Sequence, residues 1–310
     1  MKLVFMGTPA FAVPTLETLA ASRHHLLGVV TNPDRPRGRG RQPAPPPVKQ
    51  AAVDLGLPVL QPESPHEPQL AAQLRALEPD LFVVVAFSIL PAELLAIPAR
   101  GSLNLHPSLL PAYRGAAPII WAVVNGEPET GLTTFLLEAR IDAGGILLQQ
   151  RVSVGADETA GELESRLRTM GADLVLETVD RLERGIDPRP QDEAAVTRAR
   201  KLDREDGRLD WALPAERLRN QVRGMNPVPG AFTEWSGTVL KVHRAAAVAA
   251  GAAAAPGMIV AAAGREGLVV ATGAGNLRLE EVQPAGGKAM DGSAFVRGHA
   301  VAVGSRLGPT

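Results

Sequence analysis

Short, almost wholly apolar runs alternate with helical patterns over the first 140 residues, and this alternation constrains the fold more than any other feature. Leu3–Met6, Leu26–Thr31 and Leu81–Ala86 are runs of this kind. Leucines between residues 70 and 77 recur at the spacing of one helix face just before the third run. Strands that are apolar throughout are typical of parallel sheets buried on both faces. The first part of the chain is therefore predicted to be an α/β domain with a mostly parallel sheet.

The pattern continues to about residue 185 and then changes. Gly101–His106 and Leu132–Leu137 are further strand candidates, and Ala116–Val124 and Thr159–Arg184 have helical patterns. The stretch 188–208 is polar and charged without apolar periodicity, which is typical of a linker. Short apolar runs separated by turn residues follow it and predict a small β-barrel. These runs are Ala231–Trp235, Thr238–His243, Gly257–Ala263, Gly267–Ala271 and Leu277–Val282.

Two domains are expected in a chain of 310 residues. The predicted boundaries are 1–188 for the catalytic domain, 189–204 for the linker and 205–310 for the β-barrel domain. Pro214–Arg223 is predicted to form a helix near the start of the second domain. The alanine-rich stretch Ala245–Ala255 contains a glycine and precedes a proline, so it is predicted to be a surface loop rather than a helix.

Composition excludes several classes of chemistry. The chain has no cysteine, which excludes disulfides, thiolate metal sites and a cysteine nucleophile. Its formal net charge is −1, so any contact with nucleic acid must come from local basic segments. The apolar run at the N-terminus is too short for a signal peptide, and no segment approaches the roughly 18 apolar residues of a membrane helix. We therefore expect a cytoplasmic protein that makes no membrane contact.

Three polar residues follow or end two neighbouring strand candidates. Asn104 and His106 lie at the carboxyl end of one strand, where open parallel sheets bind their ligands, and their spacing places both side chains on one side. Asp142 follows the next strand, so we expect it beside His106. An Asn amide can donate to an oxygen that becomes negative, a His can hold or release a proton, and an Asp can orient the imidazole. The trio suits acyl transfer without a covalent enzyme intermediate.

Less specific explanations exist for each of these features. An isolated Asn-x-His on a strand is more often structural than catalytic, and a single Asp in a glycine-bearing loop is usually a turn residue. Ser108 lacks the strand–elbow–helix context of a hydrolase nucleophile. The histidines are scattered without a pair at ligand spacing, so no metal is expected. Gly7-Thr8-Pro9 does not complete the dinucleotide glycine pattern, which argues against NAD.

An arginine-rich stretch interrupts the path from the second strand to its helix. Residues 32–47 carry four arginines among glycines and prolines, against one aspartate. A connection of this length is uncommon in α/β units and is usually functional or disordered. We interpret it as a basic finger for the phosphate backbone of nucleic acid, the alternative being a solvated loop. The predicted linker adds further basic residues, among them Lys201.

Nearly the whole chain resembles the methionyl-tRNA formyltransferase family. The Asn-x-His, Ser-Leu-Leu-Pro and Asp motifs are shared with the wider group of folate formyltransferases and formyl hydrolases, whereas the arginine-rich insertion and the C-terminal motifs are specific to the tRNA enzymes. The densest match is 104–119. The other matching segments are 7–12, 33–36, 38–40, 47–49, 129–131, 142–144, 210–211, 226–227 and 283–288.

This resemblance implies a Rossmann-like catalytic domain of the formyltransferase fold and an OB-like C-terminal barrel. It implies formyl transfer from 10-formyltetrahydrofolate to the α-amine of initiator methionyl-tRNA, which gives N-formylmethionyl-tRNA for translation initiation, without a metal. The alternative is a folate-dependent formyltransferase acting on a small amine, such as an amino sugar nucleotide or glycinamide ribonucleotide. We expect a monomer.

The resemblance also implies roles for individual residues. The catalytic residues would be Asn104, His106 and Asp142. The folate-binding residues would be Ser108, Leu109, Leu110, Pro111, Phe87 and Ile89. The tRNA-binding residues would be Arg35, Arg37, Arg39, Arg41 and Lys201.

Three features depart from the family pattern, one of them Gly145, which often has an acidic counterpart in the family. Arg140 stands where the family usually has glycine, and arginine tolerates a positive φ poorly, which leaves the conformation of this loop open. The turn 86–91 is one residue shorter than usual.

Overall fold

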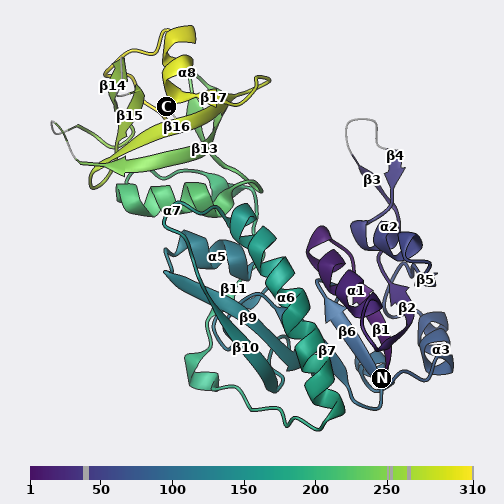
Figure 1. Cartoon of the computed structure of the whole chain (residues 1–310). Coiled ribbons are helices and arrows are strands. Elements are labelled where there is room, and N and C mark those ends of the chain that lie inside the picture. Colours follow the sequence, from purple (N-terminus) through teal and green to yellow (C-terminus); the bar gives the residue numbers. More distant parts are fainter. Residues whose placement is uncertain (38–41, 250, 252–253, 264–266, 309–310) are drawn as a thin grey trace. The chain divides into compact units, whose positions relative to one another are not determined.

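The structure is a computed structural model that describes residues 1–37, 42–249, 251, 254–263 and 267–308 (Figure 1). The chain divides into two compact units. The first consists of Met1–Gly115, Glu129–Ser153 and Glu164–Ala199. The second consists of Ala116–Pro128, Val154–Leu163 and Arg200–Thr310. Helix α6 (Ala160–Glu183) contributes residues to both.

A sheet of seven strands forms the first unit over its described residues, in the order β10-β9-β7-β6-β1-β2-β5. The five strands from β7 to β5 are parallel, whereas β9 and β10 are antiparallel to their neighbours. The predicted α/β domain with a mostly parallel sheet is therefore confirmed. The strands are β1 (Lys2–Gly7), β2 (His25–Val30), β5 (Val59–Leu60), β6 (Leu81–Val85), β7 (Ser102–His106), β9 (Glu129–Leu136) and β10 (Ile146–Ser153).

Local sequence explains the central elements of this unit. All five residues of β6 are buried, as expected for a strand covered on both faces. Gly7 ends β1, and a Cβ atom there would lie 2.9 Å from the carbonyl oxygen of Val85, so only glycine allows this approach of β1 and β6. Three helices have proline in their first turn, where a missing N–H costs nothing. These are α1 (Val13–Ala20), α2 (Pro47–Asp54) and α3 (Pro68–Ala76).

The direction of β9 differs from the expectation. β9 pairs antiparallel with β7, with Leu136 opposite Leu103 and Thr133 opposite His106. The carboxyl end of β9 therefore lies beside the amino end of β7, so Asp142 does not follow a strand that is parallel to β7. The loop 137–145, which joins β9 to β10, carries Asp142 to its position instead.

The second unit is built around an antiparallel sheet in the order β12-β13-β16-β15-β14. Helix α5 (Pro118–Val124), expected with the first domain, packs here against α7 (Ala215–Met225), where a Cβ atom on Gly224 would lie 2.5 Å from Cγ2 of Val124. The helix predicted at 214–223 is thus present. The strands are β12 (Ala231–Trp235), β13 (Thr238–Val248), β14 (Ile259–Ala263), β15 (Gly267–Ala271), β16 (Asn276–Pro284) and β17 (Met290–Asp291), followed by α8 (Gly292–Gly298).

The alanine-rich stretch is only partly a loop. Ala245–Val248 continue β13 and pair with β16, so the predicted loop is wrong for these four residues. Within the part of the chain that the structure describes, no helix is long and apolar enough to cross a membrane.

Candidate active site

Strand β7 presents Asn104 and His106, and each side chain is held by one backbone carbonyl. Nδ2 of Asn104 donates to the carbonyl oxygen of Val84 at 3.0 Å. Nε2 of His106 lies 2.9 Å from the carbonyl oxygen of Tyr113. A carbonyl only accepts, so Nε2 must carry a proton, and the neutral ring has its lone pair on Nδ1.

The carboxylate of Asp142 lies next to that free nitrogen. Oδ2 of Asp142 is 3.8 Å from Nδ1 of His106, and their side chains are 15% and 6% exposed. The same oxygen accepts a hydrogen bond from the backbone N–H of Gly115 at 2.8 Å. The separation is too long for a hydrogen bond with the neutral ring, but it stabilises a positive charge once Nδ1 takes up a proton.

Burial decides the resting charge of the imidazole. Removal of the ring from water lowers the pKa of His106 below its ordinary value of 6.5, and this effect outweighs Asp142 and the Tyr113 carbonyl, which both raise the pKa. His106 is therefore neutral at physiological pH and can accept a proton at Nδ1.

The strained residue of the β9–β10 loop is the aspartate itself. Asp142 has a φ of 52°, in the left-handed region that Asp tolerates better than most residues. Arg140 is not among the described residues with positive φ, and its guanidinium donates to Oε2 of Glu193 at 2.8 Å. Arginine in place of the family glycine therefore puts no strain on the backbone at position 140.

A cavity of about 100 Å³ joins Asn104 to Asp142. Its other lining residues come from the turn after β6, from Leu95 and from the β9–β10 loop, and most of them are apolar. Phe87 and Ile89 lie on it, and the side chain of Ile89 is 69% exposed. His106 does not line this cavity, but its Nδ1 faces Asp142, which does. The cavity thus has a polar end, formed by the Asn104 amide and the Asp142 carboxylate, next to an apolar wall.

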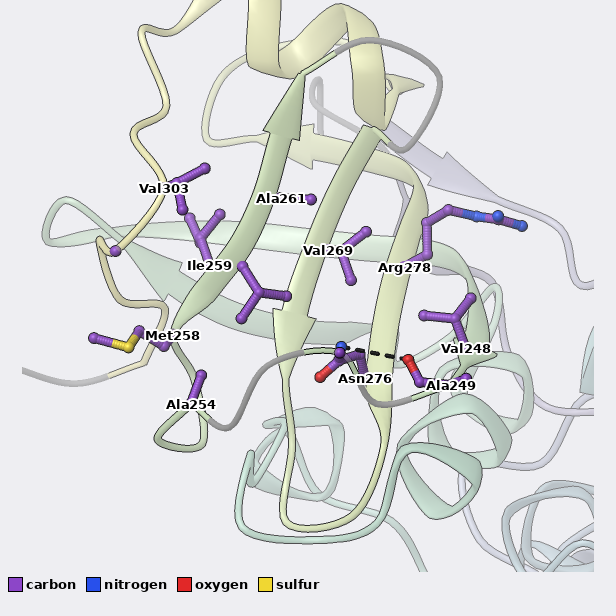
Figure 2. Close-up of a pocket in the computed structure, with 13 residues that line it drawn as sticks. Val248, Ala249, Ala254, Met258, Ile259, Ala261, Val269, Asn276, Arg278 and Val303 are labelled. Atoms are coloured by element: carbon purple, nitrogen blue, oxygen red, sulfur yellow. Dashed lines mark hydrogen bonds between the residues drawn. The ribbon is translucent and has the colours of Figure 1, made fainter.

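A larger cavity, of about 610 Å³, lies in the second unit, and its described lining residues include no histidine or carboxylate (Figure 2). Most of its described lining is apolar, with aliphatic side chains from β13, β14 and β15 among it. The guanidinium of Arg278 extends away from these side chains in Figure 2.

The segment 108–111 supports the site from inside and does not line the cavity. Ser108 is fully buried and its hydroxyl donates to the carbonyl of Ala112 at 2.6 Å. Leu110 is buried against Phe135 and Ile146. Leu109 and Pro111 are half-buried. The assignment of these four residues to folate binding stays a prediction.

The arginine-rich stretch forms a two-stranded ribbon, β3 (Arg35–Arg37) and β4 (Gln42–Ala44), that projects beyond α2 (Figure 1). Arg39 and Arg41 lie outside the described residues. Arg35 is exposed and pairs with Glu63 at 3.3 Å. Asp34 at the base of the ribbon binds Lys49 at 2.8 Å and accepts from Gln61, and these two partners lower its pKa. The only acid of the stretch is thus already neutralised by α2.

Sequence reasoning missed the residues that hold the site together. Tyr113 and Gly115 supply the carbonyl and the N–H that fix His106 and Asp142. Gln191, in the predicted linker, donates to the carbonyls of Asp142 and Gly144. Backbone groups carry no sequence signal, and Gln191 is 49 positions from Asp142 in the chain. Only Tyr113 and Gly115 lie in a segment, 104–119, that the family resemblance had marked.

Two regions of the chain match models of one protein family. Residues 1–179 match the family model described as formyl transferase, and residues 201–300 match the model of the formyl transferase C-terminal domain. The chain belongs to the formyl transferase family. Residues 180–200 lie outside both matched regions of the family.

Relatives in this family are similar over the full length. The chain is 48% identical to the methionyl-tRNA formyltransferase of Moorella thermoacetica over 99% of both chains. It is also 48% identical to the methionyl-tRNA formyltransferase of Roseiflexus castenholzii, again over 99% of both.

Solved structures share the fold at low identity. An N-formyltransferase from Helicobacter canadensis, solved with folinic acid and dTDP-3-aminofucose, superposes with a TM-score of 0.67 at 18% identity, over 89% of this chain and 97% of that one. HypX from Aquifex aeolicus with tetrahydrofolic acid gives 0.64 at 20% identity, over 96% of this chain and 47% of the other.

Proposed function

We propose that this chain transfers a formyl group from 10-formyltetrahydrofolate to the α-amine of initiator methionyl-tRNA. The observation that carries the proposal is the convergence of Asn104 and His106 of strand β7 with Asp142 of the β9–β10 loop. It occurs in a chain whose full-length relatives are named methionyl-tRNA formyltransferases. The product is N-formylmethionyl-tRNA, the substrate of translation initiation, and we place the enzyme in the cytoplasm.

In this proposal the cavity receives the head of the folate donor. Its apolar part, with Phe87 and Ile89, suits a flat ring system, and its polar end brings the Asn104 amide and the Asp142 carboxylate to the bound formyl group. The folate supplies the formyl group. In this proposal Ser108, Leu109, Leu110 and Pro111 also belong to the folate-binding residues.

Asn104 stabilises negative charge on the formyl oxygen. One N–H of its amide is bound to the Val84 carbonyl, which fixes the plane of the group and leaves the second N–H for the cavity. A donor held in advance at the position where charge develops is among the most effective catalytic devices.

His106 and Asp142 together handle the proton of the attacking amine. The neutral ring accepts this proton at Nδ1, while Nε2 stays bound to Tyr113. Asp142, 3.8 Å away, stabilises the imidazolium that results. The same Nδ1–H then returns the proton to the departing folate nitrogen, so one proton passes from amine to leaving group.

The tRNA contacts come from local basic elements. We assign Arg35, Arg37, Arg39, Arg41 and Lys201 to the phosphate backbone, because Asp34 is already paired and Lys201 is exposed. The functional division follows the predicted boundaries, with catalysis in 1–188, the connection in 189–204 and further tRNA contact in 205–310. The protein acts as a monomer and without a metal in this proposal.

Formylation of purified acceptors tests the function directly. The purified chain with 10-formyltetrahydrofolate should formylate initiator methionyl-tRNA and leave an amino sugar nucleotide and glycinamide ribonucleotide unmodified. Formylation of either small amine in preference to methionyl-tRNA would replace this proposal by its alternative.

A further inference from the structure

The segment 189–199 is bound to the first unit although its sequence is typical of a linker. Its β11 (Arg198–Ala199) pairs in parallel with β8 (Arg114–Gly115), and Arg189 exchanges two backbone hydrogen bonds with Ile146. It lies outside both matched family regions.

The side-chain amide of Gln191 forms hydrogen bonds to the Asp142 loop through its nitrogen and to Arg114 through its oxygen. Its Nε2 donates to the carbonyl oxygens of Asp142 and Gly144, both at 2.8 Å. Its Oε1 accepts from Nε and Nη2 of Arg114 at 3.0 and 2.8 Å. Both N–H groups and the oxygen are therefore satisfied in this one orientation, which fixes the side chain.

Arg114 anchors Gln191 from the other side. The arginine is only 4% exposed, and its guanidinium pairs with Glu193 at 3.0 Å. Arg114 and then Arg140 lower the pKa of Glu193, which keeps this carboxylate charged. A buried guanidinium whose partners are all in place does not reorient without a large cost.

The same segment also holds the loop that fixes the histidine ring. Oγ1 of Thr197 accepts from the backbone N–H of Tyr113 at 2.8 Å, and the carbonyl of Thr197 accepts from the N–H of Arg114 at 2.9 Å. Tyr113 has a φ of 61°, and its carbonyl accepts from His106. Two residues with left-handed backbone, Tyr113 and Asp142, thus set the His106–Asp142 pair, and both need such external support to persist.

We propose that Gln191 is a positioning residue for the catalytic pair, because its amide holds the Asp142 loop at a distance from His106 at which the carboxylate stabilises the imidazolium. The proposal rests on the function proposed above. It assigns to the predicted linker a part in the chemistry, and it identifies Gln191 as the residue through which that part acts.

Substitution of Gln191 by methionine tests this role, since Gln191→Met keeps length and shape and adds no charge. It removes both donors to the Asp142 loop, together with the oxygen that accepts from Arg114. Gln221 is a matched control, because its Nε2 also bridges two backbone carbonyls, those of Asp206 and Arg208, in the second unit. Gln191→Met should lower the melting temperature at least as much as Gln221→Met, because it also removes one of the acceptors of the buried Arg114. Only Gln191→Met should change the site.

The first readout is the pKa of His106 by NMR, with its resonance identified by its loss in His106→Gln. Asp142 raises this pKa, so release of the loop should lower it. A longer separation than 3.8 Å weakens the attraction between Asp142 and the imidazolium, so the pKa of His106 should fall in Gln191→Met. Gln221→Met should leave the value unchanged.

The second readout is steady-state formylation of methionyl-tRNA. Gln191→Met should reduce kcat on the order of 10- to 100-fold with KM values for both substrates near wild type, as expected for a misplaced catalytic group. Equal kinetic losses in the two methionine variants, or an unchanged His106 pKa, would make Gln191 merely structural and overturn the proposal.

Two further measurements distinguish failure of the variant to fold, failure of the proposed function and failure of the role proposed for Gln191. If Gln191→Met does not fold, Thr197→Val tests the same segment, because it removes the acceptor for Tyr113 and should also shift the His106 pKa. If the wild type does not formylate methionyl-tRNA, the proposed function fails, while the NMR comparison still decides whether Gln191 positions the pair.

Discussion

Removal of the Asn104 amide tests the proposed charge stabilisation most directly. The structure commits one N–H of this amide to the Val84 carbonyl, so Asn104→Ala takes only a single donor away from the reacting oxygen. One such donor is worth about 2.7–4 kcal/mol, or a loss on the order of 10²- to 10³-fold in kcat. The apolar surface at Phe87 and Ile89 is untouched, so the KM for the folate should change little.

The assay is initial-rate formylation of methionyl-tRNA at saturating concentrations of both substrates. Asn226→Ala is the matched control, since Nδ2 of Asn226 also donates to a backbone carbonyl, that of His243, at 2.7 Å in the second unit. Each substitution should lower the free energy of unfolding by about 1 kcal/mol through the lost hydrogen bond. A kcat for Asn104→Ala within a factor of a few of wild type would refute the oxyanion role.

Two further predictions concern the basic ribbon and the buried ring. Replacement of the four arginines 35, 37, 39 and 41 by alanine should weaken tRNA binding. It should also reduce the slope of log K against log salt concentration by roughly 0.9 for each lost phosphate contact, and Arg75→Ala is the exposed control. An unchanged slope would show that the ribbon does not contact the tRNA. Burial lowers the pKa of His106 in the folded protein below 6.5, so the unfolded chain binds more protons and stability falls as the pH drops through this range. In urea denaturation between about pH 7.5 and about pH 5.5, His106→Gln should therefore lose less stability than wild type, and equal losses would contradict a buried neutral ring.

The sequence by itself determined the elements whose signals are local. The apolar runs that became β1 and β6, the helix-periodic stretch that became α6, and the two-residue spacing of Asn104 and His106 on β7 all follow from the periods of strand and helix. The placement of Asn104 and His106 on one side of β7 was predictable for the same reason, since alternate residues of a strand share a side.

Only the tertiary structure decided how distant segments combine. Parallel and antiparallel strands carry the same apolar pattern, so the direction of β9 was not readable, and Asp142 reaches His106 through the β9–β10 loop instead of a strand end. The packing of α5 in the second unit and the hold of Gln191 on the Asp142 loop depend on contacts between residues far apart in the chain. Backbone carbonyls and N–H groups make most of these contacts, and every residue type supplies them alike.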